Sequence, residues 1–263
     1  MSGDRQGVLV TFEGVQKRFG PKVVYSDLSL SIARGETVTI LGGSGSGKSV
    51  MLKMLNGLIP ADAGTITFDG KDITHLPESE LVDVRRRIAY LFQGAALFDS
   101  LDVGENVAYG LREQYWRTMN EDAIGERVAR SLAAVGLPGI ERMRPSDLSG
   151  GMKKRVGLAR TLALEPEVML YDEPTTGLDP VNTARINRLI TSIRDRLGLT
   201  SLVVTHEMST AFQVSDRIVM VGQGRVLLEG PPQLFRTTSD PTVRAFIDGQ
   251  APAEERVEDL LRS

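Results

Sequence analysis

One segment of eight residues restricts the possible folds more than any other part of the chain. Residues 42–49 read GGSGSGKS, follow the β-branched run ETVTIL and precede the helical pattern KSVMLKML. Glycines allow backbone N–H groups to turn inward around phosphate oxygens, and the start of the following helix adds its positive end. The sequence therefore predicts a strand, a phosphate-binding loop and a helix, in the order found in α/β proteins.

Within this loop, two side chains are expected to complete the site. Lys48 reaches the outer phosphates of a nucleotide, and the Ser49 hydroxyl ligates Mg²⁺. A glycine-rich turn with an incidental lysine is the alternative, and the strand–loop–helix context disfavours it. The residues predicted to bind the nucleotide here are Gly42, Gly43, Ser44, Gly45, Ser46, Gly47, Lys48, Ser49 and Val50.

The composition removes several classes of protein from consideration. The chain has 263 residues, of which 41% are hydrophobic and 25% charged, as in soluble globular domains. It contains no cysteine, which excludes disulfides, thiolate metal sites and a cysteine nucleophile. The net charge of −3 gives no basic excess, so we expect no nucleic acid partner. No apolar run approaches the ~18 residues that span a bilayer, so another chain is expected to supply any membrane part.

Three patterns follow one another along the chain. Residues 8–32 alternate apolar and polar positions in short runs, which predicts an antiparallel β-subdomain. Residues 94–165 carry mainly helical periodicity and are expected to form an inserted α-helical subdomain. Buried strands then alternate with helices, which is typical of a mostly parallel sheet with helices on both faces. The expected fold class is α/β, with one domain over residues 8–246 and a tail over residues 247–263.

Two acidic residues end one of the predicted buried strands. The run EVMLYDEP places Asp172 and Glu173 at the carboxyl end of a strand, where ligands bind in doubly wound sheets. We expect Asp172 to face the coordination sphere of Mg²⁺, and Glu173 to position a water molecule for attack on the γ-phosphate. A solvated acidic turn that only ends the strand is the alternative, which the phosphate loop disfavours.

Six features, in this order, make the sequence similar to ATP-binding cassette ATPases of the P-loop NTPase class over nearly its whole length. They are the phosphate loop at 42–49, Gln93, the signature LSGGM at 148–152, the pair Asp172 and Glu173, the triplet GLD at 177–179, and His206. Within this superfamily, LFQGAALFDSLDVGENV, LSGGMKKRVGLAR and YDEPTTGLDP resemble the ATPase subunits of bacterial MCE-type lipid transporters, which include the Mla phospholipid system. The resemblance implies ATP and Mg²⁺ as the bound groups, and hydrolysis of ATP coupled to transport.

The resemblance also implies roles for residues that no local pattern singles out. Phe19 stands at the adenine-stacking position, although a strand-end core phenylalanine is the alternative. Gln93 is expected to reach Mg²⁺ or the attacking water. His206 is expected to bind the γ-phosphate and orient that water, unless it only caps a helix. Asp179 is expected to lie near the phosphates of a partner chain and also to begin a helix.

The signature is a second glycine-rich helix start, which the resemblance assigns to the ATP of another copy of the chain. Ser149, Gly150 and Gly151 are expected to offer a hydroxyl and backbone N–H groups to a γ-phosphate held by Lys48 of that copy. The implied assembly is a head-to-tail homodimer with ATP at the interface.

Two residues depart from the pattern of the family. Val50 stands where many members have a second hydroxyl that touches an inner phosphate, so we expect slightly weaker nucleotide binding and no loss of activity. Met152 stands where much of the superfamily has glutamine, and its thioether cannot donate a hydrogen bond. The phosphate contacts precede Met152 and are expected to be kept.

The resemblance places the chain at the cytoplasmic face of the inner membrane, attached through an integral membrane permease. An MCE-domain protein is a further expected partner, and a small STAS-type regulatory subunit is a candidate one. Leu97, Phe98 and Tyr109 are candidates for the permease-docking surface, with packing inside the helical insert as an equal alternative.

Two other functions stay open at this point. One is the ATPase of a different importer, for amino acids or metal chelates, which would share every motif described above. The other is a soluble ATP-switch protein without a transport role. Such proteins usually carry two cassettes or a long coiled-coil insertion, and this sequence has neither. In the tail, Val257, Leu260 and Leu261 predict a short amphipathic helix.

Overall fold

Ten strands of the described chain form one mixed sheet. The computed structural model describes residues 7–115 and 118–250. Its strands are β1 (Val8–Phe19), β2 (Lys22–Ala33), β3 (Thr37–Leu41), β4 (Ala63–Phe68), β5 (Lys71–Asp72), β6 (Ile88–Leu91), β7 (Val168–Asp172), β8 (Thr200–Thr205), β9 (Arg217–Gly222) and β10 (Arg225–Gly230). Their order across the sheet is β5-β4-β1-β2-β10-β9-β3-β8-β7-β6.

The sheet has an antiparallel half and a mostly parallel half. Strands β5, β4, β1 and β2 pair antiparallel, whereas β9, β3, β8, β7 and β6 run parallel to one another. Strand β10 pairs antiparallel with β9 and meets β2 through one residue pair, Arg225 with Asp27. The predicted α/β fold class is confirmed, and the two halves of the sheet share few backbone hydrogen bonds.

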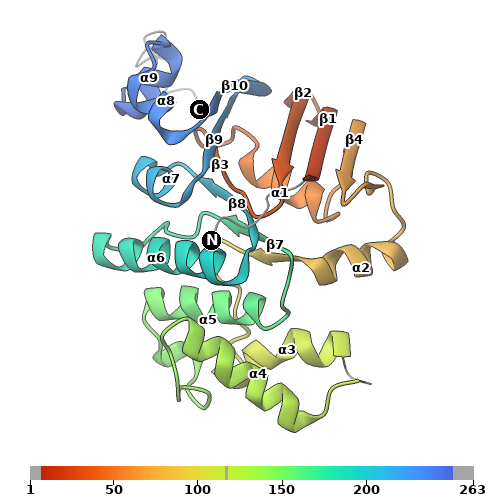
Figure 1. Cartoon of the computed structure of the whole chain (residues 1–263), viewed down its shortest axis with the longest axis vertical. Coiled ribbons are helices and arrows are strands. Elements are labelled where there is room, and N and C mark those ends of the chain that lie inside the picture. The colour runs from red at the N-terminus through yellow and green to blue at the C-terminus, as the bar shows by residue number, and fades with distance from the viewer. Residues whose placement is uncertain (1–6, 116–117, 251–263) are drawn as a thin grey trace.

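Helices surround the parallel half of the sheet. They are α1 (Lys48–Leu55), α2 (Glu78–Arg87), α3 (Val103–Tyr115), α4 (Glu121–Ala134), the 3₁₀ turn η1 (Pro145–Asp147), α5 (Gly150–Leu162), α6 (Pro180–Leu197), α7 (Met208–Val214), α8 (Pro232–Thr237) and α9 (Pro241–Ile247). In Figure 1, α3, α4 and α5 lie together at the bottom of the view, below α6. These helices fall in the segment expected to form the insert. The expected boundaries of insert and domain stay predictions.

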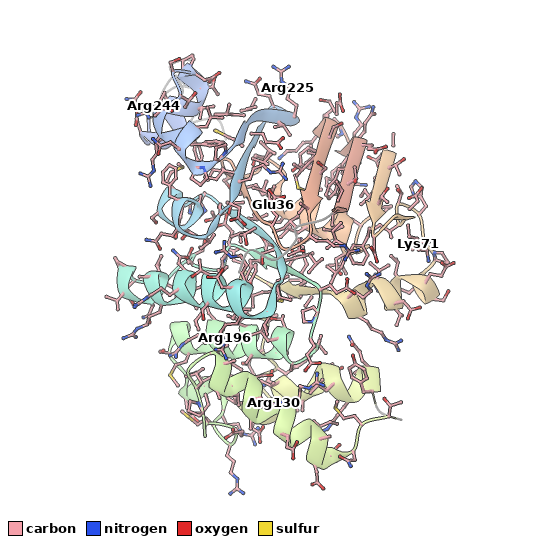
Figure 2. The ribbon with its side chains drawn as sticks, viewed as in Figure 1. Glu36, Lys71, Arg130, Arg196, Arg225 and Arg244 are labelled. Atoms are coloured by element: carbon pink, nitrogen blue, oxygen red, sulfur yellow. The ribbon has the colours of Figure 1, made fainter. Side chains whose placement is uncertain are left out.

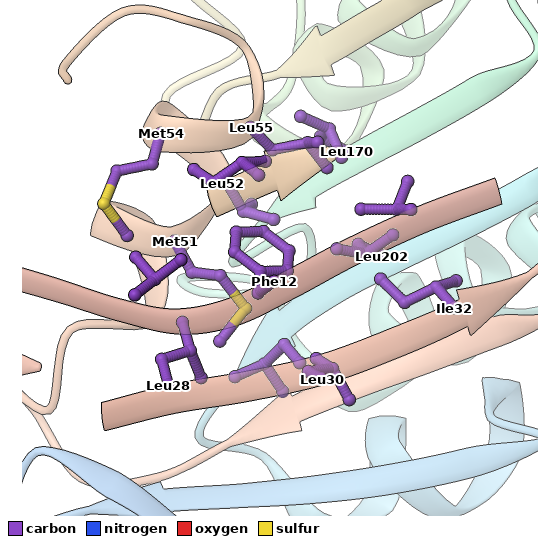
Figure 3. Close-up of a cluster of buried hydrophobic side chains, with 14 of the residues drawn as sticks. Phe12, Leu28, Leu30, Ile32, Met51, Leu52, Met54, Leu55, Leu170 and Leu202 are labelled. Atoms are coloured by element: carbon purple, nitrogen blue, oxygen red, sulfur yellow. The ribbon is translucent and has the colours of Figure 1, made fainter. Parts of the chain in front are cut away.

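Alternating side chains of β7 pack against two different layers of the core. Leu170 faces the layer shown in Figure 3, with Met51 and Leu52 of α1 and Phe12 of β1. Tyr171, the next residue, faces the opposite layer, which contains α5 and α6. Burial of one such apolar side chain contributes about 1.5–3 kcal/mol. Helix α1, which follows the phosphate loop, is therefore held between both halves of the sheet.

One helix has no counterpart among the patterns of the sequence. The pattern RRIAYLFQ, residues 86–93, predicts a strand that runs into a loop, and β6 (Ile88–Leu91) lies within it. The first two residues of the pattern belong to α2, which extends to Arg87. Helix α2 buries only Leu81 and Val84, so its sequence shows no continuous apolar stripe.

Charged side chains are distributed over the whole length of the molecule in Figure 2. The labelled Arg130, Arg196 and Arg225 come from α4, α6 and β10. In the segments 7–115 and 118–250, no helix has both the length and the apolar character needed to cross a membrane. The apolar stripe expected in the tail lies outside the described residues.

Candidate nucleotide site

The phosphate loop joins β3 to α1, and its glycines meet steric demands. Gly47 precedes α1 with a φ of 99°, a left-handed conformation that side chains disfavour. A Cβ atom at Gly47 would come within 2.6 Å of Val24 Cγ1, and one at Gly42 within 2.5 Å of the Val221 carbonyl oxygen. The Ser46 hydroxyl is buried without a hydrogen-bond partner in the described part of the chain, which suits a bound acceptor. The loop geometry is therefore that of a phosphate cradle.

Lys48 is buried at the start of α1 and points into the loop. Its ammonium group donates to the carbonyl oxygens of Gly42, at 2.8 Å, and Gly43, at 2.9 Å. Glu173 Oε1 lies 3.8 Å away. Burial lowers the pKa of Lys48, and the nearby Glu173 and Asp172 carboxylates oppose that shift. A cation with these contacts is available to phosphate oxygens at the loop.

The residues expected to hold Mg²⁺ meet directly. Ser49 Oγ donates to Asp172 Oδ1 at 2.6 Å, and the Tyr90 hydroxyl donates to Asp172 Oδ2 at 2.7 Å. Burial and the contact with Asp172 raise the pKa of Tyr90, so this phenol stays a hydrogen-bond donor. One carboxylate and one hydroxyl fit Mg²⁺, which takes few protein ligands and completes its shell with phosphate and water. The described residues contain no cluster of three or more metal-ligating side chains.

Glu173 and His206 meet at the edge of the loop. His206 Nδ1 lies 3.0 Å from each carboxylate oxygen of Glu173, and Thr176 Oγ1 donates to Oε2 at 3.0 Å. Glu173 has a φ of 49°, a conformation that costs about 1–2 kcal/mol for a residue with a Cβ. If Nδ1–H donates to Glu173, Nε2 of a neutral ring is an acceptor. A hydrogen bond from His206 to a phosphate oxygen therefore requires a ring N–H that is not already donated to Glu173.

A cleft of about 680 Å³ brings many of the predicted residues together. Its lining includes Phe19, Gly43, Ser44, Gly45, Gly47, Lys48, Ser49, Val50, Gln93, Glu173 and His206. The Phe19 side chain is 49% exposed, which leaves ring surface for an aromatic base. Lys17 Nζ lies 5.2 Å from the centre of the Phe19 ring. Gly42 and Asp172 contact the lining residues Lys48 and Ser49, respectively.

The signature residues and Asp179 are absent from the lining of this cleft among the described residues. Ser149 is the N-cap of α5, and its Oγ accepts a hydrogen bond from the Met152 N–H at 3.3 Å. Ser149 and Gly150 are exposed, and Gly151 is buried. Asp179 is the N-cap of α6, where the N–H of Asn182 and other donors lower its pKa. Their expected roles toward a partner copy stay predictions.

Five residues at or beneath the site have no expected role in the sequence. Lys22, Val24 and Phe246 also line the cleft, Tyr90 holds Asp172, and Lys154 contacts the backbone of Glu173. Lys22 and Val24 lie close behind Phe19 in the chain, which is the one local signal available. Phe246 comes from α9, and its distance in sequence hides it from pattern reasoning.

The candidate docking residues separate into two environments. The rings of Phe98 and Tyr109 have centres 4.7 Å apart, and both side chains are exposed. Leu97 is partly buried and packs against the core that contains α3, α4 and α5. Leu97 therefore fits the alternative, which is packing inside the helical insert. A docking role for the exposed aromatic pair stays a prediction.

Comparison with known proteins gives consistent matches. A family model described as ABC transporter matches residues 25–176. The Mycobacterium tuberculosis probable ribonucleotide transport ATP-binding protein mkl is 41% identical over 248 residues, which cover 94% of this chain and 68% of that protein. The Escherichia coli intermembrane phospholipid transport system ATP-binding protein MlaF is 37% identical over 243 residues, which cover 92% of this chain and 90% of MlaF.

A solved structure extends the likeness to a complex with nucleotide products. It is a dimeric post-hydrolysis state of an ATP-binding cassette, bound to ADP and Pi. The match has a TM-score of 0.78 and 32% sequence identity, and covers 85% of this chain and 99% of that one.

Proposed function

The chain belongs to the ABC transporter family, and from this premise we propose that it binds ATP with Mg²⁺ in the cleft and hydrolyses it. The observation that carries the proposal is the meeting of two pairs at the phosphate loop. One pair is Ser49 with Asp172, and the other is Glu173 with His206. The first pair offers oxygen ligands, and the second offers a base with a partner that orients it.

The roles of the side chains follow from their positions. The phosphate loop and Lys48 bind the β- and γ-phosphates, and the exposed face of Phe19 stacks on the base. Glu173 accepts a proton as a water oxygen attacks the γ-phosphorus, and the bond to the bridging oxygen of ADP breaks. Gln93 and His206 orient the water and the γ-phosphate. Ser49 and Asp172 would hold Mg²⁺, which would supply neutralisation of the phosphate charge.

A second copy of the chain completes the site in this proposal. Ser149, Gly150 and Gly151 of one copy contact the γ-phosphate held by the other, and Asp179 lies at the same interface. The dimeric post-hydrolysis structure of a related cassette supports this arrangement. The exposure of Ser149 and Gly150 also supports it, because free N–H groups at a helix start attract anions.

The transported compound is proposed to be a phospholipid or another lipid, moved between membranes by an MCE-type permease complex at the inner membrane. The likeness to MlaF supports this assignment, because the match spans 90% of that phospholipid transport protein. The candidate partners are an integral permease, an MCE-domain protein and a small STAS-type subunit. The exposed pair Phe98 and Tyr109 is the proposed contact with the permease.

Ribonucleotide transport is a second candidate, because the name of the mycobacterial relative contains it. The match spans only 68% of that relative, compared with 90% of MlaF. An importer for amino acids or metal chelates shares the same ATPase chemistry. The ATPase residues do not distinguish these compounds, so a test must identify what the assembled transporter holds.

Purification of the complex tests the transport assignment. The full chain carrying Glu173→Gln is isolated from detergent-solubilised membranes in Mg-ATP, and the bound proteins and small molecules are identified by mass spectrometry. We expect a permease, an MCE-domain protein and co-purified phospholipid. Recovery of a solute-binding protein with an amino acid, or of ribonucleotides with no MCE-domain protein, would reject the lipid assignment and leave the ATPase assignment unaffected.

A further inference from the structure

Lys154 is a buried cation beneath the nucleotide cleft. It extends from α5, and only 7% of the residue is exposed. Its ammonium group donates to the backbone carbonyl oxygens of Gln93 and Glu173, the latter at 3.1 Å. Burial lowers the pKa of Lys154, while the charges of Glu173, Glu207 and Asp172 oppose that shift. Because desolvation of an ammonium group is costly, the two hydrogen bonds are the main compensation for its burial.

Both acceptors belong to segments with an unusual backbone conformation. Glu173 has a φ of 49°, and Ala95, two residues after Gln93, has a φ of 61°. Residues with a Cβ avoid this region unless their surroundings hold them in it. Helix α5 also contacts the Gln93 loop through Arg160, which donates to the carbonyl oxygens of Ala95 and Ala96 at 2.7 Å each. One helix thus holds the loop at two points and Glu173 at a third.

The start of the same helix faces outward. Ser149 caps α5, and Lys154 follows five residues later, a distance of about 7.5 Å along a helix axis. A continuous α-helix transmits a displacement over this length with little internal change. A ligand that pulls on Ser149 and Gly150 therefore also displaces Lys154.

We propose that Lys154 is a positioning residue that fixes the backbone of Glu173 and Gln93 and makes their geometry depend on the position of helix α5. The inference rests on the proposed function, in which the start of α5 binds the ATP of a partner copy. Each chain then carries a direct path from the partner's ATP to its own hydrolytic residues. Binding of ATP in the partner's cleft accelerates hydrolysis in this chain's cleft, because α5 moves the Glu173 backbone to where its carboxylate can accept a proton from the attacking water.

A purely structural lysine would behave differently on substitution. Methionine has nearly the length of lysine and keeps the packing of α5, but it leaves the carbonyl oxygens of Gln93 and Glu173 without their donor, which costs stability. A structural role therefore predicts a changed melting temperature, or altered ATP binding, in step with any change in rate. A positioning role predicts a fall in kcat with unchanged ATP binding.

The test uses the full-length chain with Mg-ATP and compares Lys154→Met with the wild type. We expect kcat to fall about tenfold, because a small misplacement of the base is enough to slow the attack. The Kd for a non-hydrolysable ATP analogue should stay within about twofold, since the phosphate loop is intact. The Hill coefficient for ATP should fall toward one, which loss of stability alone does not cause.

Lys153→Met is the matched control, because it removes the neighbouring lysine of the same helix, which is only partly buried. It should retain the wild-type kcat and Hill coefficient. Lys154→Arg keeps hydrogen-bond donors and should restore kcat to within about threefold of the wild type. If Lys154→Met does not fold, Lys154→Gln takes its place, with an amide that reaches one carbonyl in place of two.

Three results would overturn the proposal. One is a wild-type kcat and Hill coefficient in Lys154→Met, or in Lys154→Gln if that variant is the one that folds. Another is a Lys154→Arg variant as slow as Lys154→Met. The third is a parallel loss of ATP binding and thermal stability. In each case the proposed function still holds if the wild-type chain hydrolyses ATP and the Glu173→Gln variant does not. A wild-type chain without hydrolysis would overturn both.

Discussion

Glycines lie at the starts of both α1 and α5, yet the two starts are built in different ways. Helix α1 follows Gly47 in a left-handed conformation, and no side chain caps its first turn. Helix α5 follows Ser149, whose hydroxyl accepts a hydrogen bond from the Met152 N–H. The first start opens into a deep cleft with Lys48 and the Ser49–Asp172 pair. The second has its Ser149 and Gly150 exposed, and its first three residues, Gly150, Gly151 and Met152, include neither a lysine nor a metal ligand.

Under the proposed function, this difference means that similar sequence patterns serve different parts of one reaction. An uncapped helix start offers all its first N–H groups to a ligand, and a serine cap removes one of them. The start of α1 therefore suffices to bind a nucleotide within one chain. The start of α5 is suited to a ligand that another chain already holds. Substitutions that affect only one of the two starts test this distinction.

The largest effect is expected from Glu173→Gln, which removes the base and leaves both helix starts unchanged. ATP hydrolysis should fall about thousandfold, since a glutamine amide cannot accept the proton. The ATP-bound chain should accumulate as a dimer in gel filtration with light scattering, because α5 still contacts the unhydrolysed γ-phosphate. Hydrolysis at the wild-type rate would show that Glu173 is not catalytic, and a monomer at saturating ATP would remove the role assigned to α5.

Gly47→Ala should damage the start of α1. The new Cβ atom would lie 2.6 Å from Val24 Cγ1, and the alanine residue would have to adopt a φ near 99°. We expect the Kd for ATP to rise about a hundredfold and the melting temperature to fall, because the loop must shift to relieve the contact. Isothermal titration calorimetry and differential scanning calorimetry measure the two quantities. ATP binding at wild-type strength would contradict the steric account of the loop.

Gly150→Ala makes the corresponding change at the start of α5 and should act differently. Its Cβ meets nothing closer than Leu178 Cδ2 at 4.0 Å, so the fold has room for it. The melting temperature and the Kd of the monomer for ATP should not change. The kcat should fall about tenfold, because the methyl group obstructs the approach of a partner's γ-phosphate. Equal losses in binding and rate would mean that α5 contributes to its own chain's site.

Val50→Thr should produce the smallest effect and refines the account of α1. Val50 lines the cleft and also packs against the core below it. A threonine hydroxyl offers one more contact to an inner phosphate and places a polar atom against that core. We expect the Kd for ATP to fall by about threefold, with a slight loss of thermal stability. An unchanged Kd would show that valine at position 50 does not weaken nucleotide binding.

Local motifs made much of the parallel half predictable. The phosphate loop, the acidic pair and His206 each lie at the carboxyl end of a strand, and the apolar run of that strand is visible in the sequence. Ends of parallel strands lie on one edge of the sheet, so these residues had to meet. The contact of Ser49 with Asp172 follows from this rule.

Other parts of the site depend on packing that no short pattern encodes. Tyr90 and Lys154 read as ordinary members of an apolar strand and a basic helix, and only the fold places them against Asp172 and Glu173. Phe246 reaches the cleft from α9, more than two hundred residues after Phe19. Helix α2 escapes prediction because it buries two side chains in place of a stripe.

Strands β2 and β10 meet through a single residue pair, so a bound nucleotide is expected to stiffen the protein at this junction between the two halves of the sheet. Phe19 ends a strand of the antiparallel half and Lys48 follows a strand of the parallel half, yet both line one cleft. A bound ATP therefore acts as a reversible cross-link over a seam that is otherwise held mainly by side-chain packing. Occupancy should damp the sliding of one half against the other. Amide hydrogen exchange along β2 and β10 should slow on ATP binding, which makes the seam a reporter of the nucleotide state.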